Sequence, residues 1–390
     1  MSIPEPANAS CCRAGRKMPQ ASSANRMRRR CRCFILPQLL ILGFCAVVPG
    51  VLAQQAENIF ATAPFAASHA STVVELKNGD IMSAWFGGTA EGNPDVAIWS
   101  ARKVSGKWTA PIELVREPDT PSWNPVLFHT KDGRLWLYYK FGPSASTWTA
   151  GRKYSDDEGL TWTAAEHLPA GLVGPVRAKP LVLDDGTIVS GSSVEAYLSW
   201  AAWIERSTDA GKSWKKIGPI TVPVDPSAPG VESVIPSQVP GSADWKNTFG
   251  IIQPSVLSLG GKHLRLYARS TAKVGKICVA DSYDDGLTWT QAHPIDVPNP
   301  NSGLDAVSLR DGRVVLVYNN TTSGRTPLNL AVSADGERFN MFYTLESQPG
   351  EYSYPAVIQA RNGDLLITYT WNRKTIRFVR FPLSRIPKSF

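Results

Sequence analysis

Polar side chains recur at one place in a repeated pattern, about seven to ten residues ahead of each of six turns. The residues found there are His69, Asn124, Arg177, Gln253, Asp305, Tyr352 and Tyr354. A second polar set follows the turns by about eight to ten residues and includes Lys140, Glu195, Arg269 and Arg373. Arginine binds carboxylate, sulfate or phosphate through forked hydrogen bonds, and His, Glu and Tyr transfer protons. Brought together, these residue types would form an anion-binding site with acid–base chemistry.

The six turns themselves predict how the chain could bring these residues together. They are Asn78-Gly79, Asp132-Gly133, Asp185-Gly186, Gly260-Gly261, Asp311-Gly312 and Asn362-Gly363, at glycine-to-glycine intervals of 54, 53, 75, 51 and 51 residues. Each joins two short runs with alternating apolar residues, which is typical of a β-hairpin. A period near 50 residues predicts an all-β fold, a six-bladed β-propeller of four-stranded antiparallel sheets. In such a ring the innermost strands share one axial pocket.

A second repeat lies out of phase with the hairpin turns. The pattern S-x-D-x-G-x-[ST]-W occurs at 155–162, 207–214 and 282–289, with degenerate copies beginning at Ser333 and Ser100. Asp can close a turn with its side chain, Gly supplies positive φ, and Trp packs between sheets. A motif copied in several sheets is more consistent with scaffold than with catalysis, because an active site occurs once.

The N-terminal residues 1–53 have the pattern of a secretory leader, with arginines between Arg26 and Arg32 and an apolar run from Phe34 to Leu52. Counted from Met27 the leader has an ordinary length, so Met27 is an alternative start. We therefore expect a secreted or periplasmic protein with no stable membrane anchor after cleavage. Residues 54–390 are predicted to form a single propeller, with an inserted loop around 219–250 in the longest interval.

Charge and cysteine content exclude several classes of function. The whole chain has 41 basic and 33 acidic residues, but the leader holds eight of the former and one of the latter, which leaves a net charge of +1. General attraction to nucleic acid or membranes is therefore not expected. Cys278 is the one cysteine beyond the leader, and the five histidines have no short metal spacing. The sequence predicts no disulfide framework, no metal site and no cofactor.

With its S-x-D-x-G-x-[ST]-W boxes on a six-fold period, the chain resembles the sialidase (neuraminidase) superfamily, the Asp-box or bacterial neuraminidase repeat proteins, from about residue 58 to about residue 385. The resemblance implies three arginines for a sugar carboxylate, a loop acid and a tyrosine nucleophile activated by a glutamate. Tyr352 matches the nucleophile, and Arg269 and Arg325 match two of the arginines. Glu91 or Asp95 lies in the loop that would carry the acid.

Two positions depart from the family pattern. The first arginine is replaced in the segment around Ser68-His69, and the glutamate expected 16 residues before Arg269 is Gln253. Glutamine cannot accept a proton, so the ordinary mechanism lacks its base at that position. Glu195, predicted on a neighbouring sheet, is the substitute if its side chain reaches Tyr352.

The leading hypothesis is a secreted sialidase-like glycoside hydrolase, an exo-glycosidase that acts on an exposed acidic sugar of the sialic or uronic acid type. Its catalytic residues would be Tyr352, Glu195, Asp95, Glu91 and His69. Its substrate-binding residues would be Arg269, Arg325, Arg177, Arg373, Gln253, Asn124, Lys140 and Tyr354. The expected partner is a glycan, and the oligomeric state is left open.

Two alternatives stay open at this point. A polysaccharide lyase could use His69 and Tyr354 to move protons beside a uronic-acid carboxylate held by Arg177, since His with Arg supplies both a base and a cation for the enolate. A non-catalytic carbohydrate-binding propeller would account for the loss of the family's first arginine and glutamate.

Overall fold

The computed structural model describes residues 56–223 and 248–388, and in these ranges the chain is built almost entirely of β-strands. The helical elements described are two short 3-10 turns, η1 (Ala145–Thr147) and η4 (Leu383–Arg385). No helix in the described ranges is long and apolar enough to cross a membrane. The predicted leader, and residues 224–247 of the predicted inserted loop, lie outside the described residues.

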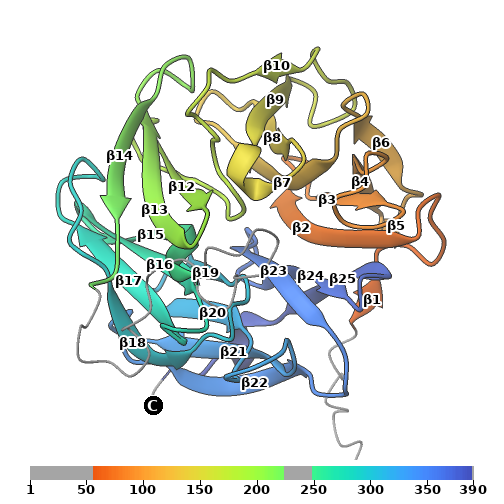
Figure 1. The fold of residues 1–390 in the computed structure, drawn as a ribbon. Helices are drawn as coiled ribbons and strands as arrows, with labels where there is room; N and C mark the ends of the chain where they lie inside the picture. The colour runs from red at the N-terminus through yellow and green to blue at the C-terminus, as the bar shows by residue number, and fades with distance from the viewer. Residues whose placement is uncertain (1–55, 224–247, 389–390) are drawn as a thin grey trace, which may run out of the picture. The chain divides into compact units, whose positions relative to one another are not determined.

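The strands pair in antiparallel groups that follow one another along the chain (Figure 1). The first group contains β2 (Ala67–Glu75), β3 (Ile81–Gly88), β4 (Ala97–Val104), β5 (Lys107–Trp108) and β6 (Ile112–Val115). The second contains β7 (Ser122–His129), β8 (Leu135–Phe141), β9 (Thr149–Ser155) and β10 (Glu166–His167). The third contains β11 (Leu181–Val182), β12 (Ile188–Ala196), β13 (Ser199–Ser207) and β14 (Lys215–Ile220).

The later groups repeat this plan. The fourth contains β15 (Phe249–Gly260), β16 (His263–Ser270), β17 (Lys276–Ser282) and β18 (His293–Pro298). The fifth contains β19 (Asp305–Ser308), β20 (Val314–Tyr318), β21 (Leu328–Ser333) and β22 (Asn340–Glu346). The sixth contains β23 (Tyr352–Gln359), β24 (Leu365–Trp371), β25 (Thr375–Phe381) and β1 (Glu57–Asn58). A short parallel pairing of β13 with β15 joins the third and fourth groups into one eight-stranded sheet.

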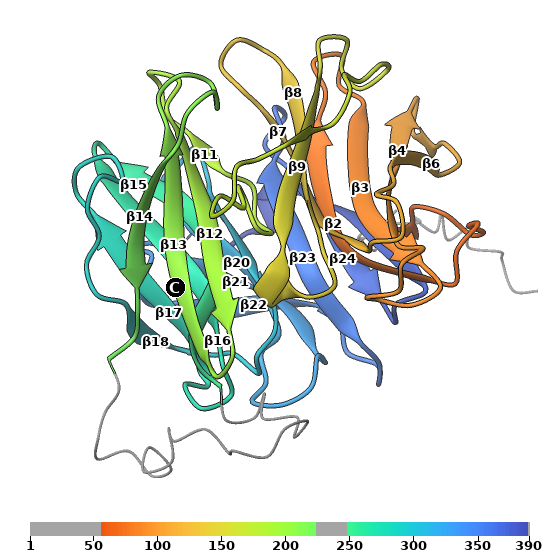
Figure 2. The same cartoon turned by 45° about the horizontal axis from the view of Figure 1, so that its top comes forward.

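The predicted all-β fold of four-stranded antiparallel sheets is confirmed, and the pairing traces six antiparallel groups in series. β1 pairs with β25, so the sixth group takes strands from both ends of the described chain. The strands β2 and β23 also contact each other, as do β2 and β7. Figures 1 and 2 show the sheets of the described residues arranged around a common centre, with β2, β7, β15 and β23 close to it.

Four of the inner strands are interrupted at the same point by a β-bulge. The register shifts lie between His69 and Thr72, Trp123 and Val126, Ile252 and Ser255, and Ser353 and Ala356. At each bulge one residue has a positive φ: Ala70 at 55°, Asn124 at 38°, Gln253 at 53° and Tyr354 at 51°. A bulge redirects the side chains beside it, so these strands change which way they face at the level of the predicted pocket.

Asp305, at the start of β19, ties four groups together near the centre. Its buried carboxylate accepts hydrogen bonds from Ser255 Oγ at 2.7 Å and from the Val357 backbone N–H at 2.8 Å. Lys179 Nζ lies 3.1 Å from the same carboxylate. Asp305 was expected to line the pocket, but all these contacts are structural, since they join the third, fourth and sixth groups to the fifth.

The repeated boxes form the turns that were expected. In the second group Ser155 Oγ donates to Asp157, while Asp157 accepts from the Thr161 N–H at 2.8 Å and the Thr161 hydroxyl at 2.6 Å. These hydrogen bonds lower the pKa of Asp157 to about 2. A carboxylate whose oxygens accept several hydrogen bonds from its own turn stabilises that turn and is not suited to transferring protons.

The boxes also receive an arginine from the preceding group. Arg102 donates to Glu158 O at 2.9 Å, and Arg206 donates to Asp285 O at 3.1 Å. Arg152 reaches Gly211 O in the same way. Such bonds satisfy carbonyl groups at the turn and fix each sheet to the next one.

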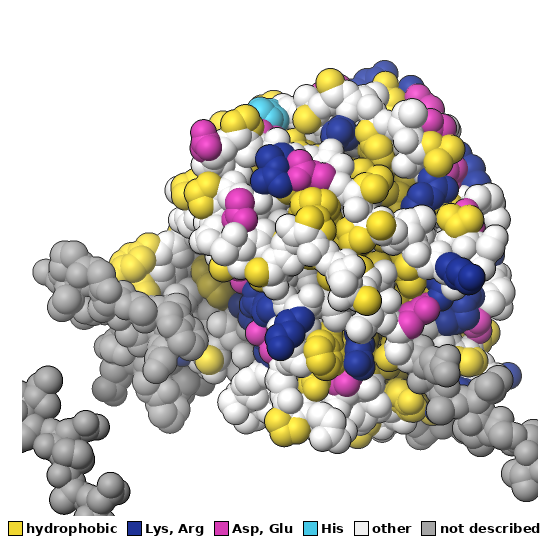
Figure 3. Space-filling view, turned by 90° about the vertical axis from the view of Figure 1, so that its right-hand side faces the viewer, with side chains coloured by type: hydrophobic (Ala, Val, Ile, Leu, Met, Phe, Trp, Pro, Cys, Tyr) yellow, Lys and Arg dark blue, Asp and Glu magenta, His cyan; other side chains and the backbone are white. Residues whose placement is uncertain are grey.

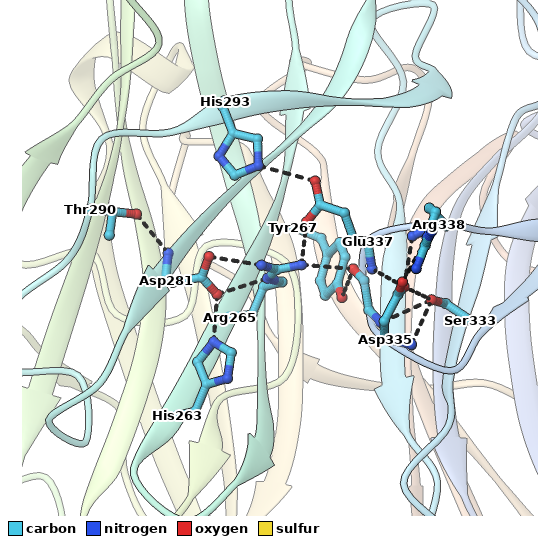
Figure 4. A network of polar contacts seen from close by, with 11 residues as sticks. His263, Arg265, Tyr267, Asp281, Thr290, His293, Ser333, Asp335, Glu337 and Arg338 are labelled. Carbon is cyan, nitrogen blue, oxygen red and sulfur yellow. Dashed lines mark hydrogen bonds and ion pairs between the residues drawn. The ribbon is translucent and has the colours of Figure 1, made fainter.

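Figure 4 shows the corresponding junction between the fourth and fifth groups. Arg265 is held by both oxygens of Asp281, at 2.8 and 2.9 Å, and donates to Gly336 O at 3.1 Å. Tyr267 donates to the same carbonyl at 2.6 Å, and Glu337 accepts from Arg265 at 2.5 Å. The degenerate box that begins at Ser333 therefore still acts as a joint.

Charged side chains on the outer surface are mixed in sign. On the face drawn in Figure 3, Lys and Arg lie next to Asp and Glu and do not gather into one basic area. Ion pairs such as Arg116–Glu113 and Arg134–Asp156 account for part of this mixing. This face therefore has no basic patch of the kind that nucleic acid requires.

Lys140 was predicted to bind substrate, but the structure places it in the interior. Its side chain is fully buried, and Nζ donates to the backbone carbonyl of Pro175 in the third group. Burial lowers the pKa of Lys140 to about 7, although the nearby Glu205 opposes the shift. Successive side chains on β8 point to opposite faces of the sheet, and that of Lys140 points to the next sheet. Its distance from the turn therefore did not predict its direction.

We predict that Lys140 makes the free energy of unfolding depend on pH. Its pKa in the folded protein is below the ordinary value of 10.5, so above about pH 7 the unfolded chain binds more protons and stability rises with pH. Between about pH 7 and about pH 8.5, wild type should gain about 1–2 kcal/mol relative to Lys140→Met. Urea denaturation measures this difference. The exposed Lys131→Met variant is the control and should behave as wild type; identical pH dependence in Lys140→Met and wild type would contradict the assignment.

Candidate active site

His69 lies at the centre of the candidate site, on β2 next to the first bulge. Its ring is buried, Nδ1 lies 2.9 Å from Thr370 Oγ1, and Nε2 is buried with no hydrogen-bond partner among the described residues. Burial lowers the pKa of His69 well below its usual 6.5, and Arg373, Arg325, Arg177 and Arg269 lower it further. The imidazole is therefore neutral at physiological pH, with one free nitrogen that can accept a proton.

Tyr354 packs directly against this imidazole. The two ring centroids are 4.2 Å apart. Its hydroxyl oxygen accepts hydrogen bonds from Arg269 Nη1 at 2.7 Å and from Gln253 Nε2 at 3.4 Å. Guanidinium groups of Arg177 and Arg325 lie 5.2 and 5.5 Å from the ring centroid. Because the oxygen already accepts two N–H donors, the hydroxyl proton is available for donation to a ligand.

The expectation that Tyr352 faces the pocket is corrected by the structure. Tyr352 is buried in a hydrophobic cluster between the fifth and sixth groups, with Leu328 and Tyr369 among its members. Burial raises the pKa of Tyr352, and the nearby charges that affect it are those of Glu346 and Arg377, not the pocket arginines. Residues two apart on a regular strand share one face, but the bulge between Ser353 and Ala356 turns Tyr354 toward the centre instead.

Two of the four arginines have no carboxylate partner among the described residues. Arg269 donates from Nε to Asn301 Oδ1 at 2.8 Å and from Nη1 to Gln253 Oε1 at 3.3 Å, besides its bond to Tyr354. Arg177 is buried and donates to the backbone carbonyls of Leu304 and Pro355. Both charges are therefore unbalanced by any ion pair within the described ranges, which favours the binding of an anion.

Glu351 balances the other two arginines, and the sequence analysis gave it no role. Its Oε1 accepts from Arg325 Nη1 at 2.8 Å, from Arg373 Nε at 2.7 Å and from Ser353 Oγ at 3.1 Å. Burial alone would raise the pKa of Glu351, but Arg373 and Arg325 together hold it below its usual value. The residue stands directly before Tyr352 and outside the turn-based spacing, so the spacing did not select it.

The two candidate loop acids have different environments. Glu91 pairs with Arg373 and lines a cavity of about 260 Å³ together with Ser68, His69 and other residues. The exposed Asp95 accepts from the Thr89 backbone N–H at 2.8 Å and from the Thr89 hydroxyl at 2.7 Å. That hydrogen bond lowers the pKa of Asp95, so the group stays ionised and holds the loop. Asp95 is not among the residues that line this cavity.

Glu195 is a second acidic group near the centre. Its Oε1 is buried without a hydrogen-bond partner in the part of the chain that the structure describes, and burial raises the pKa of the carboxyl group although Arg269 and Gln253 oppose the shift. Gln253 links this side of the site to Tyr354. The structure thus gathers His69, Tyr354, Gln253, Arg269, Arg177, Arg325, Arg373 and, by its electrostatic influence, Glu195. Asn124 is buried at the bulge of β7.

In the described ranges, no group of three or more His, Cys, Asp or Glu side chains could hold a metal ion. The described side chains of the site offer a neutral base, a hydroxyl donor and fixed positive charge.

A family model described as a BNR repeat-like domain matches residues 79–367. The chain belongs to the BNR repeat-like family. No curated protein matches it. The match to the family model, together with the sialidase structures described next, confirms the resemblance to the sialidase superfamily, of which the chain is a divergent member.

Solved structures with this BNR repeat-like fold have low sequence identity to the chain. A Dyadobacter fermentans protein of unknown function has a TM-score of 0.67 at 18% identity, covering 86% of this chain and 100% of its own. The NanB sialidase of Streptococcus pneumoniae has a TM-score of 0.65 at 13% identity, covering 85% and 71%. The intramolecular trans-sialidase of Ruminococcus gnavus has a TM-score of 0.63 at 14% identity, covering 84% and 97%. At this identity the likeness concerns the fold, which is one that glycoside hydrolase-like proteins use.

We predict that Glu351→Gln weakens the arginine cluster measurably. The variant leaves Arg325 and Arg373 without their shared carboxylate, and should lower the free energy of unfolding at neutral pH by about 1 kcal/mol, a value reduced for partial solvent screening. Because the pKa of Glu351 is held down in the folded state, the difference from wild type should shrink as pH falls through that pKa. Denaturation at two pH values tests this. Glu113→Gln, at the exposed pair with Arg116, is the matched control and should change stability by less than about 0.5 kcal/mol.

Proposed function

We propose that this protein is an exported enzyme that cleaves glycans at an exposed sugar carrying a carboxylate. The observation that carries the proposal is a neutral His69 with a free Nε2, packed on Tyr354 and surrounded by four arginines. Two of these arginines, Arg177 and Arg269, are buried without an ion pair among the described residues, and a bound anion would balance their charge. The leader pattern at residues 1–53 supports export.

Arg269 is the principal ligand for the sugar carboxylate in this proposal. It is buried, carries no ion pair among the described residues, and is held in place by Asn301 and Gln253. The guanidinium group of Arg177 lies 5.2 Å from the Tyr354 ring centroid and contributes positive charge there. A positioned guanidinium binds a carboxylate more strongly in such a water-poor site than in solvent.

β-Elimination on a uronic acid is the reaction that this geometry supports best. His69 Nε2 would take the proton from the carbon next to the carboxylate, and the arginines would stabilise the negative charge that develops there. The bond from the neighbouring ring carbon to the leaving oxygen then breaks, a carbon–carbon double bond forms, and Tyr354 donates its proton to that oxygen. Solvent afterwards returns both groups to their starting protonation states. No ionised carboxylate is needed as a nucleophile.

Hydrolysis is the second candidate, and Glu195 is the observation that favours it. A carboxyl group with a raised pKa and an unpartnered oxygen can serve as a general acid. Tyr354, in place of Tyr352, would then attack or stabilise the oxocarbenium-like centre, as sialidases use a tyrosine nucleophile. Asp95 is unsuited to the acid role because its turn keeps it ionised.

A screen of the mature protein separates these reactions. Sialosides and uronic-acid glycans are incubated with the protein, and both new reducing ends and ultraviolet absorbance are recorded. Unsaturated product indicates elimination, whereas new reducing ends without that absorbance indicate hydrolysis. Saturable binding without any product would replace both proposals with a carbohydrate-binding function.

Substitutions should separate the two tyrosines. His69→Gln and Tyr354→Phe each remove a proton-transfer group, so kcat/KM should fall by about 10²- to 10⁴-fold in each variant. Tyr352→Phe is the matched control and should retain nearly full activity, since the charges that act on its hydroxyl are those of Glu346 and Arg377 and not those of the pocket arginines. Steady-state kinetics on the substrate found in the screen provides the measurement. Full activity of Tyr354→Phe would exclude the role given to that residue.

The neutrality of His69 predicts a particular pH profile. With its pKa well below 6.5, the imidazole remains a base on mild acidification, so kcat/KM should stay level from about pH 8 to about pH 6. An ordinary histidine base would instead lose half its activity near its usual pKa. A midpoint near the usual histidine pKa in the wild-type profile would show that burial and the four arginines do not lower the pKa of His69 as described.

A further inference from the structure

We infer that Trp123 and Trp148 form a second sugar-binding position, which holds a neutral sugar linked to the acidic one. This inference rests on the proposed function. It concerns how much of a glycan the site recognises and which kind of residue it takes next to the acidic sugar.

Aromatic rings form a continuous row from His69 outward. The ring centroids of His69 and Phe86 are 5.5 Å apart, those of Phe86 and Trp123 are 5.8 Å apart, and those of Trp123 and Trp148 are also 5.8 Å apart. Phe86 is buried, whereas both tryptophans are only partly buried. The row therefore connects the interior of the pocket with a surface that a ligand can reach.

The tryptophan pair lies between the loop that carries Glu91 and the strand that carries Glu195. A Cβ atom added at Gly92 would lie 3.5 Å from the Trp123 ring, so the loop that carries Glu91 passes directly beside it. Trp148 directly follows η1, and η1 contacts β12. Glu195 is the second-to-last residue of β12. In Figure 2, η1 and the C-terminal end of β12 are found at the same end of their sheets.

The pair is held in position and offers suitable chemistry for a sugar. Trp123 donates its indole N–H to Gly142 O at 2.8 Å, which fixes the ring. Trp148 Nε1 is buried and has no hydrogen-bond partner within residues 56–223 and 248–388. Asn124, next to Trp123, is buried at the bulge with a φ of 38°, and an amide can both donate and accept hydrogen bonds. Flat aromatic faces with a few polar groups are typical of sites for uncharged polar ligands.

Charge distinguishes this position from the centre. The arginines that affect His69 surround the imidazole, whereas the outward row consists of Phe86, Trp123 and Trp148 with the amide of Asn124. Lys140 lies on the strand next to β7, but its ammonium group is buried on Pro175 O and cannot reach a ligand. A second acidic sugar would find no counter-charge on these rings, so the position fits a neutral sugar.

Two probes test the inference by isothermal titration calorimetry. One is free D-glucuronate, and the other is a hyaluronan tetrasaccharide with glucuronate at its non-reducing end and N-acetylglucosamine next to it. Wild type should bind the tetrasaccharide about three- to tenfold more tightly than glucuronate, and Trp148→Ala should lose that gain while keeping its affinity for glucuronate. The Arg269→Met variant should bind neither probe. Tyr283→Ala, an exposed aromatic residue in the box at 282–289, is the control and should match wild type.

The outcomes separate this inference from the proposed function. Equal affinity of wild type for the two probes, or full retention of the gain in Trp148→Ala, would overturn the second position alone. Failure of wild type to bind either probe would overturn the uronic-acid proposal and this position with it. Circular dichroism and urea denaturation of Trp148→Ala, together with its retained affinity for glucuronate, show that the variant is folded.

Discussion

The carboxylate of Asp305 is the contact on which the arrangement of the site depends. It receives Ser255 from β15, the backbone of Val357 from β23, and Lys179 from the segment before β11. Each of these partners stands two or three residues from a pocket residue, namely Gln253, Tyr354 and Arg177 in the same order. A buried carboxylate with all its acceptor positions occupied is a rigid anchor. The position of the catalytic candidates relative to one another therefore follows from a residue that takes no part in the chemistry.

Around this anchor the protein concentrates positive charge that it balances only in part. Glu351 holds Arg325 and Arg373, whereas Arg177 and Arg269 have no carboxylate partner among the described residues. Burial first, and then the charges of all four arginines, lower the pKa of His69, so the imidazole stays neutral. The same field that would attract an anionic sugar thus also preserves the base that would act on it.

The turn spacing was sufficient to predict the antiparallel sheets and most of the residues that meet at the centre, because a hairpin turn fixes where each strand begins. It could not predict the β-bulges, which exchange the directions of neighbouring side chains and bring Tyr354 inward in place of Tyr352. It also could not assign Lys140, whose direction depends on the sheet that packs against it. Glu351 was missed because its role exists only when two arginines from different strands converge on it.

The pairing of β1 with β25 has a consequence for how the protein is made. Most strands can pair with a neighbour as soon as both have been synthesised, and such local hairpins form quickly. The last sheet, in contrast, requires one strand from each extremity of the folded region, so it can assemble only after translation of the whole domain is complete. Until then the growing polypeptide exposes unpaired strand edges, which makes protection from aggregation during synthesis a requirement of this topology.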